Sequence, residues 1–189
     1  PIKPFFREIA ESDQATFDAW YNDEYLYLES MRVDYQNLLD RLFKEAFDFI
    51  RMGDERTGIE KITAFLDQYP DAWNGWFLLG WGHRRLGEYE TAARAFSQAV
   101  DRGADNADTF NELAICRMEL GEFEESRKSL EQALHIDPDN TKVMSNFGVL
   151  ALKQDDADEA RRYFAAVLAL EPEDPVAIRY LAYLDGEDS

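Results

Sequence analysis

The chain has 189 residues, of which 46% are hydrophobic, so it is long enough for one domain with a buried core or for a short array of repeats. It carries 39 acidic and only 20 basic residues, and its net charge of -19 argues against partners with phosphate surfaces, such as nucleic acids and anionic membranes. A single cysteine excludes an internal disulfide, and no uncharged apolar run approaches the roughly 20 residues of a membrane-spanning helix. The first residues do not resemble a secretory signal, which makes the cytoplasm the expected location.

The first 38 residues are rich in aromatic side chains and lie outside any repeat. We expect segment 1–38 to be a helical extension that caps the following domain. The alternative is a segment that lies in the protein's own groove or recognises a partner. The aromatic residues of this segment are Phe5, Phe6, Phe17, Trp20, Tyr21, Tyr25, Tyr27 and Tyr35.

The rest of the chain repeats itself with a period of 34 residues. Two columns of large apolar residues and one column of small residues recur at this period. The large residues are Trp76, Phe110, Met144 and Ile178, and then Leu79, Leu113, Phe147 and Leu181. The small residues are Gly80, Ala114, Gly148 and Ala182.

Each unit is predicted to hold two helices, because its apolar residues recur at spacings of three and four. In the first helix of the clearest unit, the face of Trp76, Leu79, Gly80 and His83 is expected to point at the core. The pattern then breaks, and the break coincides with glycine or with acidic residues, which predicts a turn. These breaks lie at Gly87, Gly121 and Asp155.

The run Trp76-x2-Leu79-Gly80-x2-His83, followed by Ala92-x3-Phe96, resembles the tetratricopeptide repeat (TPR) motif. The resemblance implies an all-α superhelix, or solenoid, of stacked helix pairs that share one core. It covers residues 39–184, with a degenerate repeat at 39–72, clear repeats at 73–106, 107–140 and 141–174, and a C-terminal helix at 175–184. Residues 185–189 form an acidic tail. The fold alone implies no particular function.

Small residues are predicted to set the distance between the two helices of a unit. Gly80, Ala114 and Gly148 are expected where these helices meet, because a large side chain there would push them apart.

The C-terminal helix has no unit after it, and it is unusually apolar for a terminal helix. We expect Ile178, Leu181 and Ala182 to face the preceding unit, which leaves Tyr180, Tyr183 and Leu184 pointing elsewhere. This apolar surface predicts either that the native chain continues or that the protein forms a homodimer through the C-terminal helix.

No pattern of catalytic or metal-binding residues is found. His83 is predicted to be a packed, hydrogen-bonded residue between the two helices of its unit, and His135 has no second metal ligand near it in sequence. Cys116 lacks an activating histidine at a recognisable spacing, so it is predicted to be a packing residue. We therefore expect no enzyme activity, no cofactor and no metal site.

A peptide-binding groove is implied by the TPR resemblance. In TPR proteins, the stripe beside the core-facing residues of each first helix lines a concave surface where peptides bind. Exposed apolar patches of this kind usually mark binding sites. The residues of this chain on that stripe are Phe43, Phe47, Phe77, Trp81, Arg84, Asn111, Ile115, Ser145, Val149, Arg179 and Tyr183.

Some TPR domains hold the C-terminal carboxylate of a peptide with Lys, Asn, Asn, Lys and Arg. Only the second lysine of this clamp is kept here, so a chaperone tail ending in Glu-Glu-Val-Asp is not an expected partner. The clamp positions are occupied by Phe77, Trp81, Glu112, Lys142 and Asn146.

The leading hypothesis is a non-enzymatic protein–protein interaction scaffold. It binds an apolar or amphipathic peptide segment, with basic flanks, in its concave groove. One alternative is an acidic TPR chaperone of secreted or membrane-active proteins. Another is a TPR module cut from a larger enzyme or regulator.

Overall fold

The computed structural model describes residues 41–186 of the chain. The chain divides into the units Pro1–Lys44 and Glu45–Ser189, and the second unit is described below. The predicted role of residues 1–38 lies outside the described residues. Every regular element of the described part is an α-helix, and none of these helices is long and apolar enough to cross a membrane. After a helical stretch at 41–52, the helices are α3 (Glu55–Gln68), α4 (Trp73–Arg85), α5 (Tyr89–Asp101), α6 (Ala107–Glu119), α7 (Phe123–Ile136), α8 (Thr141–Lys153), α9 (Ala157–Leu170) and α10 (Pro175–Asp185).

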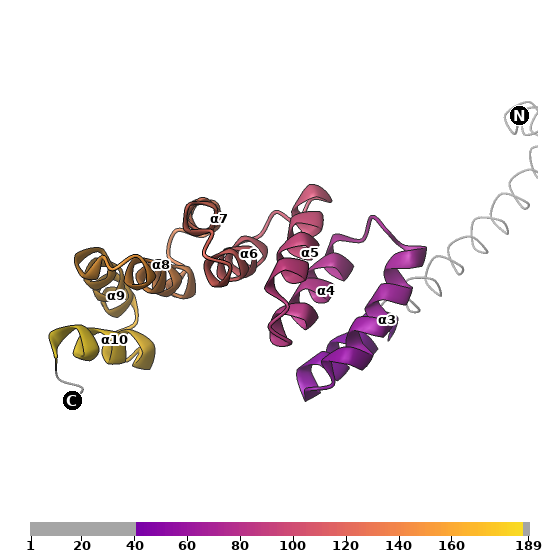
Figure 1. Cartoon of the computed structure of the whole chain (residues 1–189), viewed down its shortest axis with the longest axis horizontal. Helices are drawn as coiled ribbons and strands as arrows, with labels where there is room; N and C mark the ends of the chain where they lie inside the picture. Colours follow the sequence, from indigo (N-terminus) through magenta and orange to yellow (C-terminus); the bar gives the residue numbers. More distant parts are fainter. Residues whose placement is uncertain (1–40, 187–189) are drawn as a thin grey trace, which may run out of the picture. The chain divides into compact units, whose positions relative to one another are not determined.

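The first residues of the helices recur with the same period as the sequence repeat. The first helices of successive units, α4, α6, α8 and α10, begin at residues 73, 107, 141 and 175, which are 34 residues apart. The second helices, α3, α5, α7 and α9, begin at residues 55, 89, 123 and 157, again 34 apart. We call these two sets the A helices and the B helices. Figure 1 shows α3 to α10 following one another in sequence order.

The turn from each A helix to its B helix also recurs. Gly53, Gly87 and Gly121 have φ angles of +93°, +75° and +77°, a left-handed conformation that glycine adopts without steric cost. Asp155 occupies the same position in the third clear unit with φ 59°, and it is the one non-glycine residue with positive φ among those described. The predicted breaks at Gly87, Gly121 and Asp155 are confirmed.

Each helix packs against the next one along the chain, and neighbouring A helices also touch, α4 with α6 and α6 with α8. Small residues permit the close approach of A and B helices within a unit. A methyl group added to Gly80 would lie 2.9 Å from the ring of Phe96, and one added to Gly148 would lie 2.6 Å from the ring of Phe164. The predicted role of these glycines is confirmed.

Each A helix is buried on a second face as well, which packs against the B helix of the preceding unit. In α4 this face holds Gly75, next to Leu66 of α3, and Gly82, next to Ile59 of α3. Leu78 lies between them and is fully buried, whereas Leu79 is only half-buried. The core therefore includes a face of α4 that the sequence analysis did not assign.

The orientation predicted for α10 is wrong in part. Ala177 is fully buried, Tyr180 stacks on Phe164 of α9 with ring centroids 4.8 Å apart, and Leu184 packs against the same core. Ile178, which was expected to face the preceding unit, is instead 48% exposed. The physical reason is that Ile178 repeats the position of Trp76, on the face that meets a following B helix, and no such helix follows α10 in the described residues.

Candidate functional site

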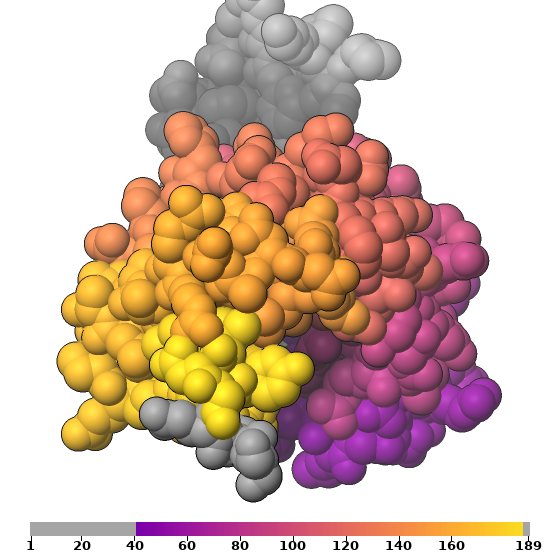
Figure 2. Space-filling view, turned by 60° about the vertical axis from the view of Figure 1, so that its left-hand side comes forward, coloured from indigo at the N-terminus to yellow at the C-terminus, as the bar shows by residue number. Residues whose placement is uncertain are grey.

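The residues of the predicted groove lie on the A helices and in stretch 41–52, and we call those from Phe47 onwards the inner face. Phe47 and Tyr183 are 39% and 63% exposed, and Arg179 is also exposed. Asn111 is buried, at 8% exposure. The half-buried residues of this face are Phe77, Trp81, Arg84, Ile115, Ser145 and Val149, and Phe43, which precedes the unit, is half-buried too. Figure 2 shows the surface hollowed between the yellow C-terminal helix and the purple-to-magenta helices at the other end of the unit.

The N-terminal end of the inner face is aromatic. Phe47 stacks on Trp81 with ring centroids 5.6 Å apart and an angle of 19° between the rings. The guanidinium of Arg85 lies over the Trp81 ring at 5.5 Å and pairs with Glu55 at 2.8 Å, which restrains the indole. Trp81 also packs against the buried cluster that contains Phe96, so it contributes both to the surface and to the core.

The middle of the inner face is polar, and its side chains connect neighbouring A helices. Arg84 of α4 lies 2.5 Å from the carboxylate of Glu112 on α6, an ion pair whose atoms are not in hydrogen-bond geometry. Burial raises the pKa of Glu112, although the charge of Arg84 opposes this shift. Asn146 of α8 donates to Oδ1 of Asn111 on α6 at 2.7 Å.

Glu112 and Asn146 belong to the inner face, but the sequence analysis named them only as clamp positions and not among the residues of the groove stripe. Both lie one residue after predicted groove positions, Asn111 and Ser145. At the 34-residue period they correspond to the fully buried Leu78. The signal in the sequence was that one position of the repeat changes from leucine to glutamate and then to asparagine. This change indicates that polar contacts replace apolar packing there.

The C-terminal end of the inner face is mixed in character. Val149 packs against two buried clusters, and Arg179 lies over the ring of Tyr180 at 5.4 Å. Tyr183 is the most exposed aromatic residue of this face. Ile115 and Ser145 lie between these residues and the aromatic end, and both are half-buried.

The structure also gives the surroundings of the two histidines and the cysteine, which the sequence analysis considered as catalytic or metal-binding residues. Nδ1 of His83 lies 2.6 Å from a carboxylate oxygen of Glu88, across the turn between α4 and α5, which confirms a hydrogen-bonded histidine. Cys116 is fully buried, and burial raises the pKa of its thiol to about 12, so it is protonated at neutral pH. His135 is exposed. Within residues 41–186, no group of three or more His, Cys, Asp or Glu side chains is placed to hold a metal ion.

A comparison with family models supports the TPR assignment. The family model described as "Cytochrome c-type biogenesis protein H TPR domain" matches residues 61–177. A search of curated protein sequences finds no significant match.

Solved structures with the same fold include several TPR proteins. PilF of Pseudomonas aeruginosa has a TM-score of 0.72 at 19% identity, over 81% of this chain and 70% of that chain. YrrB, described as a TPR protein with an unusual peptide-binding site, has a TM-score of 0.66 at 19% identity, over 83% and 82% of the two chains. The second TPR domain of human RPAP3, in complex with the HSP70 peptide SGPTIEEVD, has a TM-score of 0.52 at 25% identity, over 56% and 88%. The fold is an all-α TPR superhelix.

Proposed function

Because the chain belongs to the family of cytochrome c-type biogenesis protein H TPR domains, we propose that it is a non-enzymatic scaffold that binds a polypeptide segment on its inner face during cytochrome c assembly. The Phe47–Trp81 stack carries this proposal. It leaves a large aromatic side chain 39% exposed beside half-buried apolar neighbours. Exposed aromatic pairs of this kind are typical anchors for a partner.

The partner segment is apolar or amphipathic and has basic flanks. Its apolar part contacts Phe47, Trp81 and Ile115. The positive charge of Arg84 is matched by Glu112 within the inner face, so it does not attract an acidic segment. The net charge of -19 favours encounter with a basic segment and speeds its association at low salt.

Two of the similar structures are described by their peptide binding, which supports a peptide-binding role without defining the peptide. The peptide in the RPAP3 complex ends in Glu-Glu-Val-Asp. The clamp positions of this chain include Phe77, Trp81 and Glu112, so we propose a different class of peptide. A chaperone of secreted proteins or a module of a larger protein would use the same face, and both stay hypotheses. The cytoplasmic location also stays a prediction, because the family name gives no compartment.

The natural probe is a haem-free, unfolded apocytochrome c chain, with folded holocytochrome c for comparison. We expect the wild-type protein to bind the unfolded chain. Phe47→Ala should weaken binding by about 2 kcal/mol, roughly 30-fold, because it removes the exposed anchor. Met52→Ala is the matched control, since Met52 is an exposed apolar residue of the same helical stretch that is not part of the inner face. Equal affinities for the Phe47→Ala and wild-type proteins would exclude the inner face as the binding site.

We also propose that α10 pairs with α10 of a second copy. Its free face exposes Val176, Ile178 and Tyr183 at 40%, 48% and 63%. A twofold arrangement would bury the same face on both copies. This proposal concerns assembly, and the α10 face that it uses shares Tyr183 with the inner face.

A further inference from the structure

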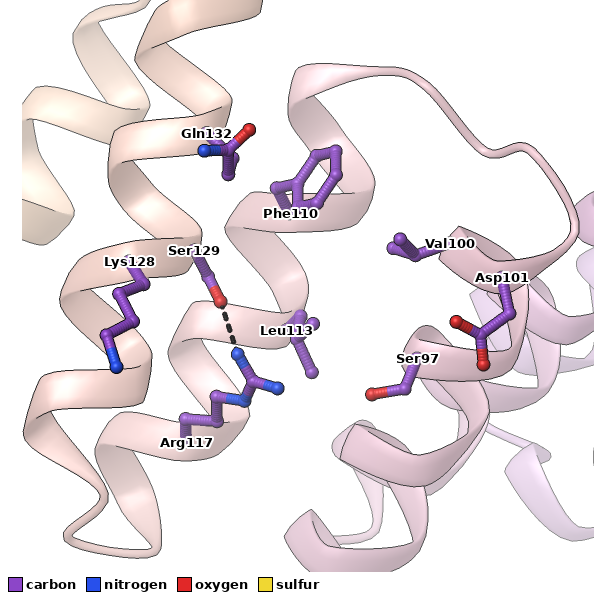
Figure 3. Close-up of a pocket in the computed structure, with 9 residues that line it drawn as sticks. All are labelled: Ser97, Val100, Asp101, Phe110, Leu113, Arg117, Lys128, Ser129 and Gln132. Carbon is purple, nitrogen blue, oxygen red and sulfur yellow. Dashed lines mark hydrogen bonds between the residues drawn. The ribbon is translucent and has the colours of Figure 1, made fainter.

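A second hollow lies between α5, α6 and α7, and we call it the α5–α7 hollow. It has a volume of about 240 Å³ and shares no residue with the inner face. In Figure 3, α5 lies on one side of the hollow and α6 and α7 on the other. Its lining residues are Ser97, Val100, Asp101, Phe110, Leu113, Arg117, Lys128, Ser129 and Gln132.

The hollow combines apolar walls with a polar rim. Val100, Phe110 and Leu113 supply the apolar surface, and Leu113 is almost fully buried. At the edge, Nη1 of Arg117 donates to Oγ of Ser129 at 2.8 Å and to the carbonyl of Glu125 at 3.2 Å. Figure 3 shows the rest of this guanidinium beside the open space.

The equivalent groove of the next unit is filled by side chains of the chain itself. The residue 34 positions after Ser129 is Tyr163, whose ring stacks on Phe147 at 4.7 Å and an angle of 8°. The guanidinium of Arg127 lies 5.9 Å from the Phe147 ring and bridges to both carboxylate oxygens of Glu159 on α9, at 3.0 and 2.7 Å. An aromatic ring and a guanidinium thus close the groove between α7 and α9.

Two small residues leave the α5–α7 hollow open. Ser129 stands where Tyr163 stands in the next unit, and Ala93 stands where Arg127 stands. Ala93 lines a second cavity, of about 540 Å³, which shares Ser97 and Arg117 with the hollow. The open space therefore extends along α5 over both positions that are filled one unit later.

We propose that the α5–α7 hollow is a docking site for a tyrosine side chain of a partner protein. The ring takes the place that Tyr163 fills in the next unit, against Leu113 in place of Phe147. Its volume is sufficient, since an apolar cavity of about 150 Å³ can hold a benzene ring. The guanidinium of Arg117 faces the ring, and Asp101 or Gln132 at the rim accepts a hydrogen bond from the phenolic hydroxyl.

The test is a titration of the full chain with p-cresol, the side-chain analogue of tyrosine, followed by amide NMR shifts. We expect saturable shifts confined to residues around Ser97, Leu113 and Ser129, with a dissociation constant in the millimolar range. The saturated analogue 4-methylcyclohexanol should bind at least tenfold more weakly, because it has no ring face for Arg117. Absence of these shifts, or equal binding of the two compounds, would overturn the proposal.

Two sets of variants make the test specific. Ser129→Tyr should abolish p-cresol binding, because it places a ring where Tyr163 stands in the next unit. Ser97→Phe closes the hollow from α5 and serves if Ser129→Tyr does not fold. Tyr163→Ser should create a second site at α7–α9. Unchanged p-cresol binding in both Ser129→Tyr and Ser97→Phe would contradict the proposal. Phe47→Ala should leave p-cresol binding unaltered, so the test of the α5–α7 hollow is separable from the test of the inner face.

Discussion

Glycine and phenylalanine are paired across the A–B interface of individual units. Gly80 lies against Phe96 and Gly148 against Phe164, with no room for a methyl group in either place. In the unit between them the same position is Ala114, and the residue of α7 in the same core cluster is Leu130. Alanine is therefore found where the opposing side chain has no ring.

This pairing predicts strong coupling between Gly80 and Phe96. In the wild-type background, Gly80→Ala should overpack the interface, at a cost of about 1–3 kcal/mol that exceeds the gain in helix propensity. In a Phe96→Leu background the same substitution should instead stabilise by up to about 1 kcal/mol, because only the helix propensity remains. Urea unfolding of the four proteins measures the coupling. An effect of Gly80→Ala that is the same in both backgrounds would contradict the pairing.

Asp155 carries a backbone strain that its counterparts Gly87 and Gly121 avoid. Because left-handed conformation costs a non-glycine residue roughly 1–2 kcal/mol, Asp155→Gly should raise the melting temperature. Gly121→Asp is the mirror substitution and should lower it by a comparable amount. A shift in the same direction for both variants would mean that side-chain contacts, not φ, dominate at this turn.

At the scale of the element, each A helix packs on two faces. Only one of these two faces could be predicted from the sequence. The face of Gly80 and His83 could be predicted because its residue types recur at the 34-residue period. The face of Gly75, Leu78 and Gly82 could not, because its glycines look like helix breakers and its later counterparts include Glu112 and Asn146. The same omission led to the wrong orientation of α10, whose buried Ala177 and half-buried Tyr180 continue this second face.

The groove residues could be named from the sequence, but the contacts between them could not. Residues such as Phe47 and Trp81 were assigned to one stripe by the TPR resemblance. Which of them contact each other depends on the distance between neighbouring A helices, and no pattern within one helix contains that distance. The Arg84–Glu112 and Asn111–Asn146 contacts are of this kind.

The raised pKa of Glu112 predicts a pH dependence of stability. A carboxyl group with a higher pKa in the folded state binds more protons when folded, so its contribution is full below the unfolded pKa and is lost as pH rises through the folded pKa. Stability of the wild-type protein relative to Glu112→Gln should therefore decrease from about pH 4.5 upwards and then level off. Urea unfolding between pH 4 and 8 measures it. A relative stability that increases with pH would show that the ion pair with Arg84 outweighs burial.

At the scale of the whole molecule, the free face of α10 predicts association. Sedimentation of the wild-type protein at several concentrations should show a dimer at tens of micromolar, and Val176→Glu with Ile178→Glu should abolish it by placing charges in the apolar contact. Met52→Glu, at an exposed apolar residue far along the chain, is the control and should still dimerise. A wild-type protein that stays monomeric at these concentrations would reject the twofold contact.

Because most contacts join neighbouring helices, parts of the array should unfold separately from one another. Each helix depends on the ones before and after it, so protection of backbone amides against exchange with deuterium should follow position in the array. Amides of α5 to α8, which have partners on both sides, should exchange slowest. Amides of α10, which packs mainly on α9 and is followed by no further helix in the described residues, should exchange fastest without any unfolding of the centre. The array should thus unfold locally at its C-terminal end, while the surfaces between α4 and α8 stay folded.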